Sequence, residues 1–303
     1  MKRFQTLLSA GAALLSAALA PNVAISDESP VPVTAETVAK RIDLAGRQRM
    51  LSQRMAKYLC FARSNVNPAE SASLLQASMA LFGETHTYLK TGNTDLDLFE
   101  ETSPRVLEAW QALDGYWQPL QRIYTDALGG KFIDEAGFDR INMLTNDTLK
   151  HANDLVVANR GTYAEFLGDG AVGEALLIDL YGRQRMLSQK LSKEVCQVAA
   201  SYDLDVTLPE LKATLDLFEN SLTAFINGYA LAGIPKPPTE EIAAQLALAE
   251  AEWLPVRQVA ADVAAGKAVN LSDLGRLADG TDGFLVEMNK AVGMLAAYNK
   301  AQS

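Results

Sequence analysis

Cysteine and histidine are both scarce in this sequence, which has two of each among its 303 residues. Two cysteines are too few for a disulfide scaffold or a thiolate zinc site, and two histidines leave little material for imidazole ligation. The sequence also lacks a Cys-x-x-Cys-His motif for c-type haem and a Glu-x-x-His pair for a di-iron centre. The sequence also shows no recognisable catalytic arrangement of a nucleophile, a base and a residue that orients the base. We therefore expect no metal, no cofactor and no enzymatic activity.

Positive charge is in deficit, with 27 Lys and Arg against 37 Asp and Glu and a formal net charge of −10. This balance argues against nucleic acid as the main partner. The β-branched alternation typical of strands is also scarce, whereas stretches rich in Ala, Leu and Gln predominate. The composition therefore predicts an all-α protein, and the length allows about two domains.

Long apolar runs are missing except near the N-terminus. Lys2 and Arg3 precede an apolar run of 14 residues from Leu7 to Ala20, which is the pattern of a secretory signal peptide. The run is too short for a membrane-spanning helix, which needs about 20 apolar residues. Residues 24–26 (Ala-Ile-Ser) fit the small-x-small rule for cleavage. We therefore expect a signal peptide over residues 1–26 and a soluble mature chain in the periplasm.

The sequence repeats itself at an offset of 136 residues. Residues 42–60 (IDLAGRQRMLSQRMAKYLC) match residues 178–196 (IDLYGRQRMLSQKLSKEVC) at 13 of 19 positions. The same offset relates further pairs without any gap: Trp117 and Trp253, Pro119 and Pro255, and Asn153 and Asn289. Such regularity predicts a tandem duplication, with repeat 1 over residues 36–167 and repeat 2 over residues 172–303.

Each repeat carries the signals of four helices. In repeat 1 we expect them over residues 34–64, 68–90, 104–128 and 135–166, because Pro, Asn and Gly mark their ends. In repeat 2 we expect Pro209 to open the second helix, and we expect Pro119 and Pro255 to kink the third helices. Short connections favour an up-down-up-down arrangement, so the prediction is two four-helix bundles with eight main helices.

The connection between the repeats limits how they can pack. In such a bundle the fourth helix ends where the first began, and the linker around residues 168–173 is short. The two first helices should therefore run parallel. If they pack together, equivalent motif positions meet across a pseudo-twofold axis, as in a symmetric dimer. The alternative places the two first helices on opposite outer faces.

On a helical wheel, the repeated motif has an apolar core stripe and a second stripe of mostly small residues. Arg49 and Arg185 lie on this second stripe. Two guanidinium groups that face each other need an anion between them, and their planar forks suit nitrate, nitrite or carboxylate. Neutral donors flank the arginines: Ser52, Gln53, Ser188 and Gln189. The alternative interpretation is that these residues form a polar contact between the helices and bind no ligand.

The two cysteines, Cys60 and Cys196, lie 11 residues beyond the arginines on the same stripe. In an oxidising compartment, parallel first helices bring them within disulfide range. If the helices splay apart, they stay two separate thiols. His86 and His151 have no counterpart in the other repeat, and we expect them at the surface or partly buried.

Residues 46–57 (GRQRMLSQRMAK) closely resemble the signature of the PilJ-type domain, the N-terminal sensor domain of type IV pilus methyl-accepting chemotaxis transducers. They are also similar to the P-box of nitrate/nitrite sensor kinases, in which one arginine from each subunit holds a nitrate at the dimer interface. The resemblance covers these twelve residues in each repeat and implies that Arg49 and Arg185 bind the ligand. The other matching positions are Gly46, Gly182, Met50, Met186, Ser52 and Ser188.

Those sensors have transmembrane helices and a cytoplasmic signalling domain, which we do not find here. The resemblance therefore implies a covalent version of a sensor dimer, which binds nitrate or nitrite between Arg49 and Arg185. It would present the bound state to a membrane sensor kinase, chemoreceptor or transporter. The alternative is a ligand-free periplasmic interaction module that docks on a membrane receptor or on a pilus or chemosensory component.

Overall fold

The computed structural model describes residues 30–302, apart from the side chains of residues 167–176, 300 and 302. The expected signal peptide, residues 1–26, lies outside this described part. The described chain is helical except for short connections and two isolated β-bridges, so the all-α prediction is confirmed. Its main helices are α1 (Ala35–Arg63), α2 (Pro68–Thr91), α3 (Pro104–Leu128), α4 (Glu135–Thr162), α5 (Ala164–Ala199), α6 (Leu204–Asn227), α7 (Glu240–Ala264) and α8 (Leu271–Gln302).

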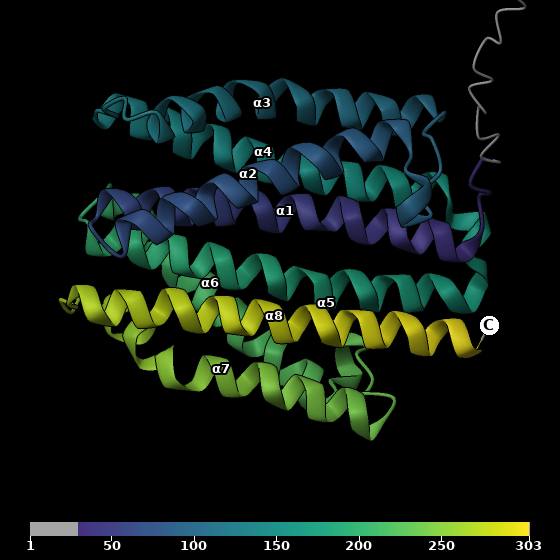
Figure 1. Cartoon of the computed structure of the whole chain (residues 1–303). Coiled ribbons are helices and arrows are strands. Elements are labelled where there is room, and N and C mark those ends of the chain that lie inside the picture. The colour runs from purple at the N-terminus through teal and green to yellow at the C-terminus, as the bar shows by residue number, and fades with distance from the viewer. Residues whose placement is uncertain (1–29, 303) are drawn as a thin grey trace, which may run out of the picture.

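Each repeat forms a four-helix bundle, and the two bundles pack through their first helices. In repeat 1, α1 packs against α2 and α4, and α3 packs against α4; α5 to α8 follow the same scheme. The helices α1 and α5 lie side by side in the middle of the molecule, whereas α3 and α7 lie at opposite outer edges (Figure 1). Asp43 of α1 pairs with Arg185 of α5, and further along both helices Cys60 forms a disulfide with Cys196. The two first helices therefore run parallel, as predicted.

Helix α1 is buried on nearly every side because it belongs both to the core of its own bundle and to the contact with α5. Its buried residues include apolar ones such as Leu51 and Phe61, and also charged ones such as Arg49 and Lys57. A helix buried all round cannot keep a one-sided apolar face. The charged side chains of α1 and α5 must therefore find their partners inside the molecule.

Equivalent residues end equivalent helices in the two repeats. Asn67 and Asp203 precede α2 and α6 with positive φ angles of 43° and 38°, a conformation that Asn and Asp tolerate better than most residues. Gly92 and Gly228 follow these helices, and their positive φ angles favour glycine. A β-carbon there would also lie 2.7 Å and 2.9 Å from backbone nitrogens of the following loops.

Three expectations about the helices are wrong, and one of them is the end of the fourth helix, which lies at Thr162 instead of residue 166. Pro209 does not open α6 but lies inside it, because Asp203 sets the start of the helix and a proline in the second turn removes only one backbone hydrogen bond. The stretch 168–173 is not a linker but part of α5. The chain reverses earlier, at Tyr163, whose hydroxyl donates to the buried Glu101 at 2.6 Å. Pro119 and Pro255 lie inside α3 and α7, as predicted.

Candidate functional site

The parallel packing of α1 and α5 brings the two copies of the repeated motif against each other. Asp43 and Arg49 of α1, together with Asp179 and Arg185 of α5, form what we call the arginine seam. Nη2 of Arg49 donates to Oδ1 of Asp179, and Nη2 of Arg185 donates to Oδ1 of Asp43 at 2.6 Å. Both arginines are only 2% exposed. Each buried guanidinium group is therefore neutralised by an aspartate of the other repeat.

The fourth helix of each bundle supplies a further acceptor in the same symmetric way. Nη1 of Arg49 donates to Oδ1 of Asn153 in α4 at 3.2 Å, and Nη1 of Arg185 donates to Oδ1 of Asn289 in α8 at 3.0 Å. These two asparagines are themselves equivalent at the offset of 136. The arginine seam thus links α1, α4, α5 and α8 through side chains that both repeats share.

Gly46 and Gly182 make room for the arginines of their own helices. A β-carbon at Gly46 would lie 3.1 Å from Nη2 of Arg49, and one at Gly182 would lie 2.9 Å from Nη2 of Arg185. The Nε atoms of the two arginines donate to the carbonyl oxygens of these glycines at 3.4 and 3.5 Å. The glycines therefore let each guanidinium group lie back along its helix and reach the aspartate opposite.

The predicted neutral donors are already hydrogen-bonded within the protein. The Ser52 and Ser188 hydroxyls donate to the backbone carbonyls of the arginines at 2.8 and 2.9 Å. Gln53 and Gln189 donate to these hydroxyls and accept hydrogen bonds from Lys193 and Lys57, respectively. The other two matching positions are apolar: Met50 is buried, and Met186 packs partly buried against the core.

The two carboxylates of the arginine seam stand among five guanidinium groups. Besides the two pairs across the seam, Arg47 lies 3.0 Å from Asp43, and Arg160 and Arg183 lie 3.5 and 3.6 Å from Asp179. Burial raises the pKa of Asp43, but its arginine neighbours outweigh this effect and hold that pKa below its ordinary value. The aspartate stays ionised, and the site keeps an excess of positive charge.

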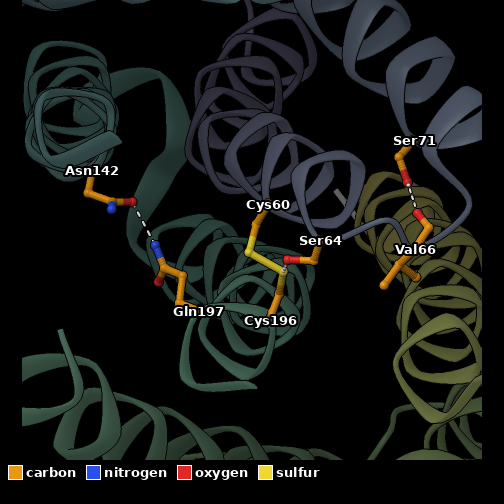
Figure 2. The surroundings of a disulfide bond; sticks show 7 residues. All are labelled: Cys60, Ser64, Val66, Ser71, Asn142, Cys196 and Gln197. Carbon is orange, nitrogen blue, oxygen red and sulfur yellow. Dashed lines mark hydrogen bonds between the residues drawn. A yellow bond between two sulfur atoms is a disulfide. The ribbon is translucent and has the colours of Figure 1, made fainter. Parts of the chain in front are cut away.

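Cys60 and Cys196 form a disulfide with 6.2 Å between their Cα atoms (Figure 2). Both are buried near the C-terminal ends of α1 and α5. The bond joins the repeats covalently about three helical turns from the arginine seam, and it requires α1 and α5 to lie close together there.

Sequence reasoning missed the residues that neutralise the arginines. Asp43 and Asp179 lie within the repeated segment, six residues before the arginines. On a helical wheel this places them 120° away from the arginine stripe. Their pairing is visible only when two helices face each other, because each arginine reaches the aspartate of the other helix. The identity of both aspartates at the offset of 136 was the available signal.

The histidines differ from each other in burial. His151 is partly buried and stacks on Tyr116, as expected. His86 is fully buried and stacks on Trp110, so the expectation of a surface or partly buried residue is wrong. Burial lowers the pKa of His86 to about 4, with Asp114 opposing the shift, and the neutral imidazole packs as an aromatic ring. In the described residues, no group of His, Cys, Asp and Glu side chains is arranged to hold a metal ion.

A family model described as the N-terminal part of type IV pili methyl-accepting chemotaxis transducers, PilJ, matches residues 34–133 and 169–274. These ranges make up more than half of the chain. The chain belongs to the PilJ family. The two matches begin in α1 and α5 and contain both copies of the repeated motif, so the PilJ domain is present twice in tandem. No curated protein and no solved structure matched the chain.

Membership in the PilJ family places the chain among the sensory domains of chemotaxis transducers, in a chemoreceptor or pilus context. Within the described residues, no helix of this PilJ chain has the length and apolar character that crossing a membrane requires.

Proposed function

We propose that this PilJ chain is an exported interaction module of a chemosensory system, in which one chain contains both halves of a sensor dimer. The main observation behind this proposal is that both arginines of the arginine seam already have ion partners within the protein. Arg49 and Arg185, which the family resemblance assigns to an anion, each bind an aspartate of the other repeat. Opening either pair leaves a buried charge alone, which costs about 3–5 kcal/mol.

The proposed location is the periplasm. The N-terminal sequence has the positive and apolar regions of a secretory signal. The disulfide between Cys60 and Cys196 supports this location, because such bonds persist in oxidising compartments. The proposed partner is a membrane-bound chemoreceptor, sensor kinase or transporter, on which the double bundle docks.

The docking proposal is tested by photo-crosslinking in intact cells. A photoreactive residue is placed at Leu231, which is 90% exposed, or at the equivalent exposed Asp95 of repeat 1, and the buried Leu51 is the control. We expect a discrete crosslink to one membrane protein with a signalling domain from at least one of these positions, and none from the buried Leu51. Crosslinks to no membrane protein from a panel of exposed positions would contradict the proposal.

A second candidate function is binding of nitrate or nitrite between Arg49 and Arg185. The excess of five guanidinium groups over two carboxylates favours it, because an added anion lowers this charge imbalance. The anion then has to compete with Asp43 and Asp179. Titration calorimetry with nitrate and nitrite should give one anion per chain and none after Arg185→Met, whereas Asp43→Asn should bind more tightly than the wild type. Equal heats in all three proteins would exclude the clamp.

A further inference from the structure

Beyond the arginine seam, the two repeats treat an equivalent pair of buried lysines differently. Lys57 of α1 is fully buried, and its ammonium group donates to Oδ1 of Asp282 in α8 at 2.7 Å. Arg54 and Tyr58 of α1 donate to the other oxygen of the same carboxylate. One carboxylate thus ties α1 of one bundle to α8 of the other. The remaining acceptors of the Lys57 ammonium group are Gln189, Ala278 and Thr281.

Lys193 is the equivalent lysine of α5, and it has far fewer partners. It is 3% exposed, and among the described residues its ammonium group donates only to Oε1 of Gln53, at 2.9 Å. The position equivalent to Asp282 is Asn146 in α4, which is exposed and supplies no charge. The carboxylate that neutralises the lysine in one half of the molecule is therefore missing from the other half.

Helix α4 nevertheless approaches α5 beside Lys193. Gln197, one turn further along α5, donates to Oδ1 of Asn142 in α4 at 2.6 Å (Figure 2). The Nδ2 group of Asn142 is buried and has no hydrogen-bond partner among the described residues. This face of the molecule thus combines a buried cation with an unused amide donor.

The free energy of this arrangement favours an added anion. A buried ammonium group with one neutral acceptor has lost most of its hydration without a compensating charge. Burial lowers the pKa of Lys193 to about 8, and Glu194 offsets only part of this effect. Glu194 itself pairs with Lys190. At neutral pH, Lys193 is therefore mostly protonated and has no ion-paired carboxylate.

We propose that Lys193 anchors a binding site for a small monocarboxylate, such as formate or acetate, between α4 and α5. The ligand carboxylate takes the place that the Asp282 side chain holds beside Lys57, and it accepts hydrogen bonds from Nζ of Lys193 and Nδ2 of Asn142. Asp282 is 23% exposed at its position. The equivalent position beside Asn146 therefore lies at the surface, where a ligand enters from solvent.

This site goes beyond the proposed function and is separate from the arginine seam. Lys193 lies eight residues after Arg185, which is about 12 Å along the helix. It needs neither an opened arginine pair nor a docking partner, so the two proposals succeed or fail independently.

The test exchanges the two positions that differ between the repeats. Acetate is titrated calorimetrically into four proteins, with chloride at the same ionic strength as the control: wild type, Asn146→Asp, Asp282→Asn, and the double swap. We expect one acetate site in the wild type, none in Asn146→Asp, two in Asp282→Asn, and one in the double swap, now beside Lys57. Circular dichroism and urea unfolding verify that each variant is folded.

A second readout locates the ligand. In protein labelled with 15N at lysine side chains, acetate should shift the Nζ resonance of Lys193 and raise its pKa, while the resonance of Lys57 stays unchanged. Absence of saturable acetate binding in the folded wild type overturns the proposal. So does binding that survives Asn146→Asp. Binding that is lost in an Arg49→Met, Arg185→Met double variant but kept in Asn146→Asp would assign the ligand to the arginine seam instead, and would also overturn it.

Discussion

The two repeats are the same at the arginine seam and different in its flanks. At the seam the two pairs that cross between the repeats are equivalent, because Arg49 pairs with Asp179 just as Arg185 pairs with Asp43. Arg160 beside Asp179 is the exception, since its counterpart in repeat 2 is Ala296. Away from the seam, Lys57 has a carboxylate partner, and Lys193 has none among the residues that the structure describes. In each pair of the seam, the loss of the aspartate leaves a buried arginine without its ion partner. The contact of Lys57 with Asp282 also crosses between the repeats, yet it is present in one direction only. Crossing between the repeats therefore does not by itself keep a contact symmetric.

The end of the bundles near the start of α1 shows the same divergence. In repeat 1, Arg41 is fully buried and pairs with Glu101 at 2.6 Å, with Asn159 and the carbonyl of Phe99 as further acceptors. Repeat 2 replaces these polar side chains with apolar ones or proline: the equivalents of Arg41, Glu101 and Asn159 are Leu177, Pro237 and Leu295. Repeat 1 is therefore held here by a buried ion pair, whereas repeat 2 relies on apolar packing.

The largest expected loss of stability comes from removing the disulfide that joins the two repeats. Replacing both Cys60 and Cys196 with serine removes a crosslink that spans 136 residues, which should lower the free energy of unfolding by about 5 kcal/mol. Urea unfolding of the wild type and the variant measures this difference. The wild type in reducing agent should match the variant, and an unchanged midpoint would mean that packing alone holds α1 against α5.

Breaking the arginine seam from either side should destabilise the protein. Arg49→Met leaves the buried Asp179 without its main partner, and Arg185→Met does the same to the partly exposed Asp43. Each change should cost up to about 3 kcal/mol of unfolding free energy. The remaining arginines near each aspartate keep the cost at this lower end. Urea unfolding that shows a large loss for one variant and none for the other would contradict the symmetry of the seam.

Acid should destabilise repeat 1 through His86. Its pKa is about 4 in the folded protein against an ordinary value of 6.5, so the unfolded chain binds more protons between these pH values. The stabilisation is complete above pH 6.5 and is lost as the pH falls to about 4, a change of about 3 kcal/mol. His86→Leu copies the equivalent Leu222 of repeat 2 and should remove this part of the pH dependence, as measured by urea unfolding from pH 7 to 4.

The smallest expected effect is an increase in stability. Asn146→Asp supplies Lys193 with the kind of carboxylate that Lys57 already has, and it should raise the free energy of unfolding by about 1 kcal/mol. Thermal unfolding at pH 7 in acetate-free buffer detects such a change. Met in place of Lys193 serves as the control, because Asn146→Asp should stabilise that protein no further.

The repeat was readable from sequence because the two copies align without a gap. Helix ends at Pro68, Pro104 and Leu128 followed from residues whose backbone preferences act locally. The end of α4 was misplaced: the helix ends at Thr162, and the hydroxyl of the following Tyr163 donates to Glu101. That residue lies 62 positions earlier in the chain, and no local pattern connects the two.

The candidate site was predictable only in part. The residues of the repeated motif and the parallel direction of their helices followed from periodicity and connectivity, whereas the packing of these two helices against each other was one of two alternatives. The carboxylates that neutralise the buried cations could not be predicted in this way. Asp43 and Asp282 pair with residues of helices that are far apart in sequence. A helical wheel describes one helix at a time and cannot show such pairs.

The sequence by itself determined the duplication, the helical class and the positions of the arginines, because these depend on local preference and on the repeat. Only the tertiary structure decided that the arginine seam is closed by its own aspartates and that Lys193 lacks the carboxylate of its counterpart. The physical reason is that a buried charge takes the nearest available partner in space. In this molecule that partner belongs to the other repeat at the arginine seam, and it is absent beside Lys193.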